Sequence, residues 1–547
     1  MMKLYEALAQ AFVAEDVRTC FALLGDANMH WAGAIDDRGI ECVYTRHEHA
    51  AVAAATAYAR ENDTVGCATV TCGPGLTQIM TILPIAVRAR IPLVIFAGEA
   101  PLNKPWYNQG IDQAPFVAAC GARYHALHDP DMMVAKVHEA FAEAKRDQIP
   151  VVIGVPFDLQ QLPCEGGDQG LISNELYQPS APVFPDQAVI GQAAEWIAQS
   201  RRPVLLAGLG VVRSHAAGAC LQLAERAGAL LATTLPAKGL FHDQEYCLGV
   251  AGGFATERSK EIFAEADLVI AIGSRLASHA FDGGKLTPDA RVIHVDIDPR
   301  EFVQGRKAAD LLIRSDAQAG AQALLEHVER REGWRNQEMA KATAHALELP
   351  DDHETPDGLL HPMAVVKKLA EIIPSDCHVL NTSGHCAYYA AQMNKHPQEN
   401  FTVIRDFGAI GNGTSFAIGV AAAFPDRPVI LIDGDGSALM HIQELETMVR
   451  HNLKILTIVL NDGAYGSEVH KLRADGVSYE GSVFGRPDIA AVARGFGLGG
   501  QTVTALDQLP DLLEQFLTSD VPCVWDVQIS DQIVSPQILK AHLAAHK

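Results

Sequence analysis

The sequence predicts an α/β protein of three domains, each with a mainly parallel sheet flanked by helices. Its 547 residues suffice for about three domains of roughly 100–200 residues each. Short apolar runs rich in β-branched residues alternate with amphipathic or alanine-rich segments of helix length, a pattern typical of parallel sheets with crossover helices. Two linker-like stretches, 162–185 and 347–358, divide the chain into segments 1–165, 186–345 and 358–547.

Strand candidates follow one another along the whole chain. Each is an apolar run of four to six residues, followed by a stretch long enough for a helix. They lie at 67–71, 93–97, 151–155, 204–208, 268–272, 292–295, 429–432 and 455–460. No short-period repeat or low-complexity tract interrupts the series, which excludes a solenoid.

The composition excludes several classes of protein. Hydrophobic residues make up 48% and charged residues 20%, as in an ordinary globular chain. A formal charge of -23 provides no basic excess, so we expect neither nucleic acid nor a membrane surface as partner. Eleven cysteines stand singly, which favours the reduced thiols of a cytoplasmic protein. The N-terminus lacks a signal-peptide pattern, and Arg88 and Arg90 interrupt the apolar stretch 80–98, so no membrane helix is expected.

The most specific pattern lies in the third segment. A strand candidate leads into Gly434-Asp435-Gly436, and after a helix-like stretch at 441–451 the next strand candidate ends beside Asp462, 27 residues after Asp435. Glycines let backbone N–H groups approach a diphosphate, and a carboxylate is a hard ligand suited to Mg²⁺. Ends of neighbouring parallel strands share one edge of the sheet, so Asp462 is expected beside Asp435.

This segment resembles the signature of thiamine-diphosphate-dependent enzymes, in which GDG is followed by Asn-Asn or Asn-Asp at the spacing seen here. The resemblance implies that Asp435, Asp462 and the backbone carbonyl of Ala464 hold Mg²⁺. It also implies cofactor contacts from Gly434, Gly436 and Ser437. Asp462 departs from the commoner Asn and adds a negative charge beside the metal. The alternative is a strand-to-helix turn whose glycines serve geometry alone.

A glutamate of the first segment matches the activating acid of the same superfamily. Residues 44–50 are predicted to form a strand end entering a helix, and 71–75 a strand followed by a Gly-Pro-Gly loop; this pair resembles the pyrimidine-binding domain. There, a buried glutamate hydrogen-bonds N1′ of the aminopyrimidine, and Glu48 is the match. This chemistry needs a carboxyl group in an apolar pocket. A solvated first-turn charge is the alternative, and structural roles are expected for His47 and His49.

Two further stretches match cofactor contacts of the family. The stretch 408–413 is too rich in glycine for a helix interior. In the family, a bulky residue here wedges between the two cofactor rings, and the carbonyl two residues earlier receives the 4′-amino group; Ile410 and Gly408 match. Ser383 and His385 follow a strand where family members contact the diphosphate or aminopyrimidine. A plain glycine-rich helix entry is the alternative for the first stretch.

Two carboxyl groups resemble catalytic residues of pyruvate and indolepyruvate decarboxylases. The loop around Asp26 is similar to one that carries a catalytic aspartate, and Glu468 matches a catalytic glutamate. Such carboxyls could protonate an enamine intermediate or relay protons. An Asx-type turn and an exposed helix-start charge are the respective alternatives. His30 and His470 are further candidates for proton transfer, although a lone histidine is more often structural.

Other features disagree with a decarboxylase or with a biosynthetic acetohydroxyacid synthase, so the substrate class stays open. The decarboxylases carry a His-His pair that 98–113 lacks, and Gly110 to Gln113 instead looks like benzaldehyde-lyase-type carboligases. The Gln-Trp and Phe-Gln-Glu of biosynthetic acetohydroxyacid synthases are also missing. The leading hypothesis is decarboxylation of a 2-oxo acid; an acetolactate-synthase-like or aldehyde-lyase-like carboligase is the near alternative. A noncatalytic nucleotide-binding homologue is a third.

The middle segment resembles the superfamily's central Rossmann-like domain, which in some members binds FAD or ADP. Gly208-x-Gly210 lacks the third glycine of a dinucleotide fingerprint because Arg213 occupies its place, which favours a structural domain over FAD or ADP binding. The resemblance spans nearly the whole chain, as a pyrimidine-binding, a central and a diphosphate-binding domain. It implies a cofactor between two subunits, hence at least a homodimer and commonly a homotetramer, acting on a small-molecule carbonyl substrate.

Overall fold

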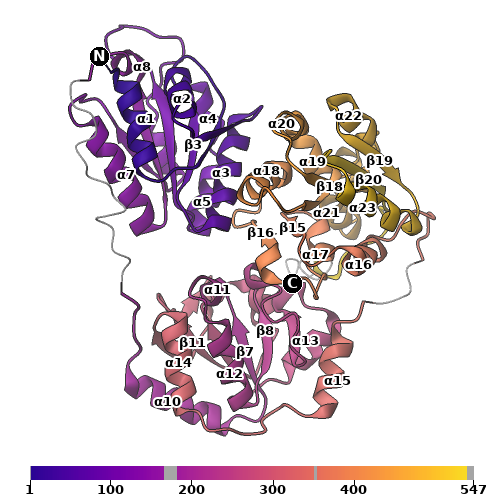
Figure 1. Cartoon of the computed structure of the whole chain (residues 1–547). Helices are drawn as coiled ribbons and strands as arrows, with labels where there is room; N and C mark the ends of the chain where they lie inside the picture. Colours follow the sequence, from indigo (N-terminus) through magenta and orange to yellow (C-terminus); the bar gives the residue numbers. More distant parts are fainter. Residues whose placement is uncertain (1, 165–180, 350–353, 539–547) are drawn as a thin grey trace.

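The computed structural model describes residues 2–164, 181–349 and 354–538, so parts of the predicted linkers at 162–185 and 347–358 lie outside the described residues. Figure 1 shows three α/β domains in chain order, from indigo through magenta to yellow. Each contains a six-stranded parallel sheet covered by helices. The predicted fold class is therefore confirmed.

The N-terminal domain is built on a sheet with strand order β2-β1-β3-β4-β6-β5. Its strands are β1 (Thr19–Ala22), β2 (Glu41–Tyr44), β3 (Gly66–Val70), β4 (Leu93–Glu99), β5 (Arg123–Ala126) and β6 (Pro150–Pro156). Its helices are α1 (Leu4–Ala14), α2 (Met29–Asp36), α3 (Glu48–Asn62), α4 (Pro74–Thr77), α5 (Ile82–Ala89), α6 (Ala114–Ala119), α7 (Met133–Asp147) and α8 (Phe157–Gln160). Apolar side chains of α1, α2 and α7 pack on one face, and those of α3 and α5 on the other. The inner strands are buried on both faces, which explains their continuous apolar runs.

The central domain repeats this architecture with strand order β14-β11-β10-β7-β8-β9. Its strands are β7 (Pro203–Ala207), β8 (Leu230–Thr233), β9 (Cys247–Val250), β10 (Leu268–Ile272), β11 (Arg291–Asp296) and β14 (Leu311–Arg314), with a hairpin of β12 (Phe302–Val303) and β13 (Arg306–Lys307). Its helices are α10 (Gln187–Gln199), α11 (Leu209–Arg213), α12 (Ala217–Ala227), α13 (Glu257–Ala264), α14 (Ala317–His327) and α15 (Gln337–Ala346).

The glycine pair of this domain serves close packing. A Cβ atom at Gly208 or Gly210 would clash with the backbone of Gly273, which follows β10. Arg213 turns toward the N-terminal domain and donates hydrogen bonds to the carbonyl oxygens of Ala89 and Arg90, both at 3.2 Å. These residues thus support the tight strand-to-helix crossing and the contact between the two domains.

The C-terminal domain has strand order β16-β15-β17-β18-β20-β19. Its strands are β15 (His378–Asn381), β16 (Phe401–Val403), β17 (Val429–Gly434), β18 (Ile455–Asn461), β19 (Gly499–Val503) and β20 (Cys523–Gln528). Its helices are α16 (Pro362–Ile372), α17 (Cys386–Ala390), α18 (Gly413–Ala423), α19 (Asp435–Met440), α20 (Glu444–Arg450), α21 (Gly466–Ala474), α22 (Ile489–Phe496) and α23 (Leu509–Thr518). In the register, Asn381 pairs with Ile432 and Gly434 with Leu460. The loops after β15, β17 and β18 therefore meet at one edge.

The eight strand candidates correspond to β3, β4, β6, β7, β10, β11, β17 and β18. The helix expected at 441–451 corresponds to α20, but the stretch expected as a loop before it contains a further helix. Helix α19 begins within the GDG motif, at Asp435, and α20 begins at Glu444. The chain leaves the helical conformation at His441, with φ -129 and ψ 39, and the Nδ1 atom of this residue lies 2.7 Å from the carbonyl oxygen of Gly411.

Helices α3 and α18 join the N-terminal and C-terminal domains (Figure 1). Small residues make this close approach possible, because a Cβ atom at Gly419 of α18 would clash with the carbonyl oxygen of Ala54 in α3. All eleven cysteines are free thiols. In the part of the chain that the structure describes, no helix has both the length and the apolar character needed to cross a membrane.

Candidate active site

A pocket opens at the carboxyl edge of the C-terminal sheet. The turn from β15 to α17, the GDG motif and the loop after β18 form its walls. It brings together ten of the residues singled out from the sequence: Ser383, His385, Ile410, Gly434, Asp435, Gly436, Ser437, Asp462, Ala464 and Glu468. Residues predicted from separate motifs thus surround one cavity.

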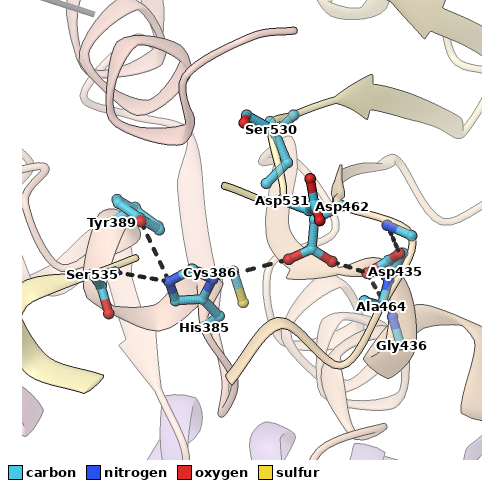
Figure 2. A network of polar contacts seen from close by, with 12 residues as sticks. His385, Cys386, Tyr389, Asp435, Gly436, Asp462, Ala464, Ser530, Asp531 and Ser535 are labelled. Carbon is cyan, nitrogen blue, oxygen red and sulfur yellow. Dashed lines mark hydrogen bonds and ion pairs between the residues drawn. The ribbon is translucent and has the colours of Figure 1, made fainter. Parts of the chain in front are cut away.

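Two buried carboxyl groups face each other in this pocket (Figure 2). Asp435, only 2% exposed, accepts hydrogen bonds from the backbone N–H groups of Gly436 (2.9 Å) and Gly463 (2.8 Å). Asp462 accepts one from the N–H of Ala464 at 3.2 Å. Burial, and next the charge of Asp462, raise the pKa of Asp435, and burial likewise raises the pKa of Asp462. A bound cation would relieve this cost.

The donors around the carboxyl pair fit a hard divalent cation and a diphosphate. The carbonyl oxygen of Ala464 accepts no hydrogen bond from any described residue. The hydroxyl group of Ser383, which lines the pocket, is buried and has no hydrogen-bond partner within the described ranges. Carboxylate and carbonyl oxygens are the ligands that Mg²⁺ prefers, while unpartnered hydroxyls are suitable donors to phosphate oxygens. No group of three or more His, Cys, Asp or Glu side chains placed to hold a metal occurs in the described residues.

Glycines give this site its shape. A Cβ atom at Gly466 would clash with the Oδ2 atom of Asp462, so the start of α21 can lie against the carboxylate only as glycine. A Cβ atom at Gly436 would lie 2.7 Å from the ring of Tyr465. Both positions therefore exclude larger side chains.

The loop before α18 contributes one predicted residue to the pocket and leaves another outside. Ile410 is half-buried and lines the cavity, whereas Gly408 is exposed, with φ +78, and does not. The hydroxyl of Ser437 is already engaged within the protein, since it donates to Asp433 (2.8 Å) and accepts from the N–H of Gly411 (2.9 Å).

His385 is held in a defined orientation (Figure 2). Its Nε2 atom accepts a hydrogen bond from the backbone N–H of Ser535 at 3.1 Å, so in the neutral ring Nδ1 carries the proton. Nδ1 lies 4.0 Å from Asp462 Oδ2. The ring of His470 lies 4.9 Å from that of His385, and burial lowers the pKa of both to about 4. Both histidines are therefore neutral at physiological pH.

Glu48 lies in the N-terminal domain and does not line the pocket of its own chain. It is the first residue of α3 and is half-buried, and its carboxyl group has no hydrogen-bond partner among the described residues. A Cβ atom at Gly75 would lie 3.4 Å from its Oε1 atom, so the two predicted N-terminal motifs adjoin. His47 caps α3 by accepting from the N–H of His49 at 3.1 Å.

The remaining sequence candidates lie apart from the pocket or at its rim. Asp26 is exposed, and its loop is held by Asn28, whose Oδ1 accepts from the N–H of Gly25 at 2.8 Å. His30 is exposed and its ring lies 5.6 Å from that of Tyr5. Glu468 lines the pocket, but its side chain is 55% exposed and 3.5 Å from Lys471.

Several lining residues were not foreseen from the sequence, among them Tyr389, Tyr465 and Ile529. Tyr389 stands four residues after His385, a spacing that places both on one helix face. Ile529 directly follows β20, which pairs with β18, so the rule that loops after neighbouring parallel strands meet could have identified it.

Comparisons with known proteins agree with this architecture. Residues 2–115, 190–324 and 382–527 match, respectively, the N-terminal TPP binding domain, the central domain and the C-terminal TPP binding domain of thiamine pyrophosphate enzymes. TPP is thiamine diphosphate.

Similar proteins match along nearly their whole length. Acetolactate synthase isozyme 2 large subunit of Escherichia coli (strain K12) is 30% identical over 96% of this chain and 95% of its own. Acetolactate synthase large subunit of Parasynechococcus marenigrum (strain WH8102) is 29% identical, with coverages of 96% and 87%. A probable acetolactate synthase large subunit of Methanocaldococcus jannaschii is 28% identical, with 98% and 93%. The chain therefore belongs to the superfamily of thiamine-diphosphate-dependent enzymes.

Proposed function

We propose that the chain is a Mg²⁺-dependent carboligase that removes CO₂ from a 2-oxo acid and joins the remaining acyl unit to the carbonyl carbon of a second compound. The observation that carries this proposal is the similarity to proteins named acetolactate synthase along 96% of the chain. It favours the carboligase, the alternative hypothesis from the sequence, over release of a free aldehyde. We infer a cytoplasmic enzyme.

Different residues around the pocket would bind the metal ion, the diphosphate and the rings of the cofactor. Asp435, Asp462 and the Ala464 carbonyl would hold Mg²⁺, because they present hard oxygens and a cation would offset the cost of burial that raises the pKa of both carboxyls. The buried, unpartnered hydroxyl of Ser383 would donate to the diphosphate, and Ile410 would support the cofactor from the cavity wall. When bound, thiamine diphosphate supplies the electron sink that takes up the electron pair of the cleaved carbon–carbon bond.

Other side chains would transfer protons or donate hydrogen bonds to the substrate. The carboxyl group of Glu48 has no hydrogen-bond partner among the residues that the structure describes, so it can share a proton with a ring nitrogen of the pyrimidine. His385 has Nδ1–H toward the pocket and would orient a carbonyl or carboxylate oxygen of the substrate. Neutral His385 and His470 also avoid the charge repulsion that two imidazolium rings 4.9 Å apart would cause.

A second copy of the chain would complete the site. The described residues that line the cavity all belong to the C-terminal domain, whereas Glu48 belongs to the N-terminal domain and is not among them. We therefore propose a homodimer at least, with Glu48 of one subunit at the cofactor of the other. A homotetramer would be a pair of such dimers.

Decarboxylation to an aldehyde is the second candidate, because the carboxyl group of Glu468 lines the pocket. Incubation with thiamine diphosphate, Mg²⁺ and pyruvate, phenylpyruvate or benzoylformate separates the two when products are identified by NMR. Hydroxyketones or 2-hydroxy-2-acyl acids support the carboligase. Free aldehyde alone supports the decarboxylase, and no CO₂ from any 2-oxo acid would remove both.

A further inference from the structure

A buried carboxyl group of the C-terminal domain holds the segment that carries Glu48. Glu444, the first residue of α20, is 0% exposed. Its two carboxylate oxygens lie 3.1 and 3.2 Å from the backbone nitrogen of Arg46, which donates to them. Thr447 donates a further hydrogen bond from its hydroxyl, at 2.7 Å. Glu444 thus fixes the backbone two residues before Glu48.

Burial makes a carboxyl group costly at this position. Taking a carboxylate out of water costs free energy, and burial raises the pKa of Glu444 to about 7. Its hydrogen bonds come from one backbone N–H and one hydroxyl, which a neutral amide could satisfy as well. The bond to Arg46 is therefore the feature to explain.

The same segment is fastened to the C-terminal domain at two more points. The N–H of Tyr44 donates to His451 Nε2 at 2.9 Å. His49 Nε2 lies 2.5 Å from Asn412 Oδ1. Glu48 stands between these attachments, without a hydrogen-bond partner of its own in the described residues, so the contacts fix its backbone and leave its carboxyl group available.

We propose that Glu444 is a positioning residue, which by accepting the Arg46 N–H sets the direction of the Glu48 carboxyl group in the cofactor site. The inference rests on the role of Glu48 in the proposed function. Because Glu48 lies outside the pocket of its own chain, the C-terminal domain of one subunit orients the acid that serves the other subunit. A displacement of about 1 Å at such a group can cost on the order of 100-fold in rate.

Three substitutions separate positioning from a general loss of structure. Glu444→Ala removes the acceptor for Arg46. Glu444→Gln keeps a carbonyl oxygen for the Arg46 N–H and can donate from its amide to Thr447. Glu446→Gln is the matched control, because Glu446 binds only the guanidinium of Arg46, with 2.6 Å from Nε to Oε2, and not its backbone.

The first readout is deuterium exchange of the C2 proton of bound thiamine diphosphate, followed by NMR after acid quenching, with Glu48→Gln as the reference for full loss. We expect exchange at least about tenfold slower in Glu444→Ala, and within about threefold of wild type in Glu444→Gln and Glu446→Gln. The second readout is hydrogen exchange of the Arg46 amide in the cofactor-free protein, which should accelerate in Glu444→Ala alone.

A wild-type rate of C2 exchange in Glu444→Ala would overturn the proposal. A rate in Glu444→Gln as slow as in Glu444→Ala would also overturn it, because the effect would then depend on the charge of Glu444 and not on its hydrogen bond. Should Glu444→Ala fail to fold, Glu444→Asp, whose side chain is one methylene shorter, carries the same comparison. Neither readout uses a carbonyl substrate. Failure of the proposed carboligation would therefore leave this test interpretable.

Discussion

At the scale of single residues, the C-terminal domain is marked by carboxyl groups that it keeps out of water. Asp433, Asp435, Glu444 and Asp462 are all buried, and burial is the main cause that raises the pKa of each. Such groups cost stability unless a ligand or hydrogen bonds compensate. Asp435 and Asp462 would be compensated by a metal, whereas Glu444 serves the backbone of Arg46.

Replacement of Asp435 by Asn should abolish stabilisation by the cofactor. In the wild type, thiamine diphosphate with Mg²⁺ should raise the thermal midpoint, because a ligand at about 100 times its Kd adds about 2.7 kcal/mol. Without cofactor, Asp435→Asn should be no less stable than wild type, since it relieves a buried charge. Asp426→Asn, an exposed position just before β17, is the control. A full cofactor-induced rise in Asp435→Asn would refute the metal assignment.

Glu444→Gln should change how stability depends on pH. The folded protein holds a proton on Glu444 up to about pH 7, whereas the unfolded chain releases it near its ordinary pKa of 4.5. Wild-type stability therefore falls as pH rises through this window, and the neutral amide lacks this loss. The midpoint of Glu444→Gln relative to wild type should rise by about 2–4 °C between pH 5 and pH 8, measured by calorimetry. A constant difference would mean that Glu444 is ionised throughout.

At the scale of elements, the sequence predicted what local patterns encode. Apolar runs located the strands, and the spacing from Asp435 to Asp462 located two loops at one sheet edge. The contact between Glu444 and Arg46 could not be predicted from the sequence, because 398 residues separate them and only tertiary packing brings them together. The non-helical turn at His441, between α19 and α20, could not be predicted either, because it depends on a contact with the carbonyl oxygen of Gly411.

The α3–α18 contact should be sensitive to one added methyl group. A Cβ atom at Gly419 would clash with backbone, the carbonyl oxygen of Ala54, so neither helix can yield by turning a side chain. Gly419→Ala should destabilise by about 1–3 kcal/mol or more. Gly191→Ala, in α10 with nothing within 4 Å of its Cβ, should stabilise by about 0.5–1 kcal/mol. Thermal unfolding measures both; an unchanged midpoint in Gly419→Ala would show that the helices separate easily.

At the scale of the whole molecule, the residues proposed to bind the metal and to activate the cofactor lie in different domains. The carboxyl pair lies in the C-terminal domain and Glu48 in the N-terminal domain, outside the pocket. The contacts of Arg46 and His49 with the C-terminal domain hold Glu48 at the junction of the two domains. In a dimer whose sites combine Glu48 of one chain with the carboxyl pair of the other, each chain would contribute residues to both sites.

Mixed dimers test this exchange. A Glu48→Gln chain and an Asp435→Asn chain carrying different tags can be co-expressed and the doubly tagged dimer isolated. If sites form between subunits, one site combines both substitutions and the other is intact, so about one thiamine diphosphate binds per dimer and its C2 proton exchanges at the wild-type rate. If each chain builds its own site, the Glu48→Gln chain still binds cofactor, but that proton exchanges slowly. Doubly tagged wild-type dimers provide the reference, and slow exchange of all bound cofactor would refute the shared site.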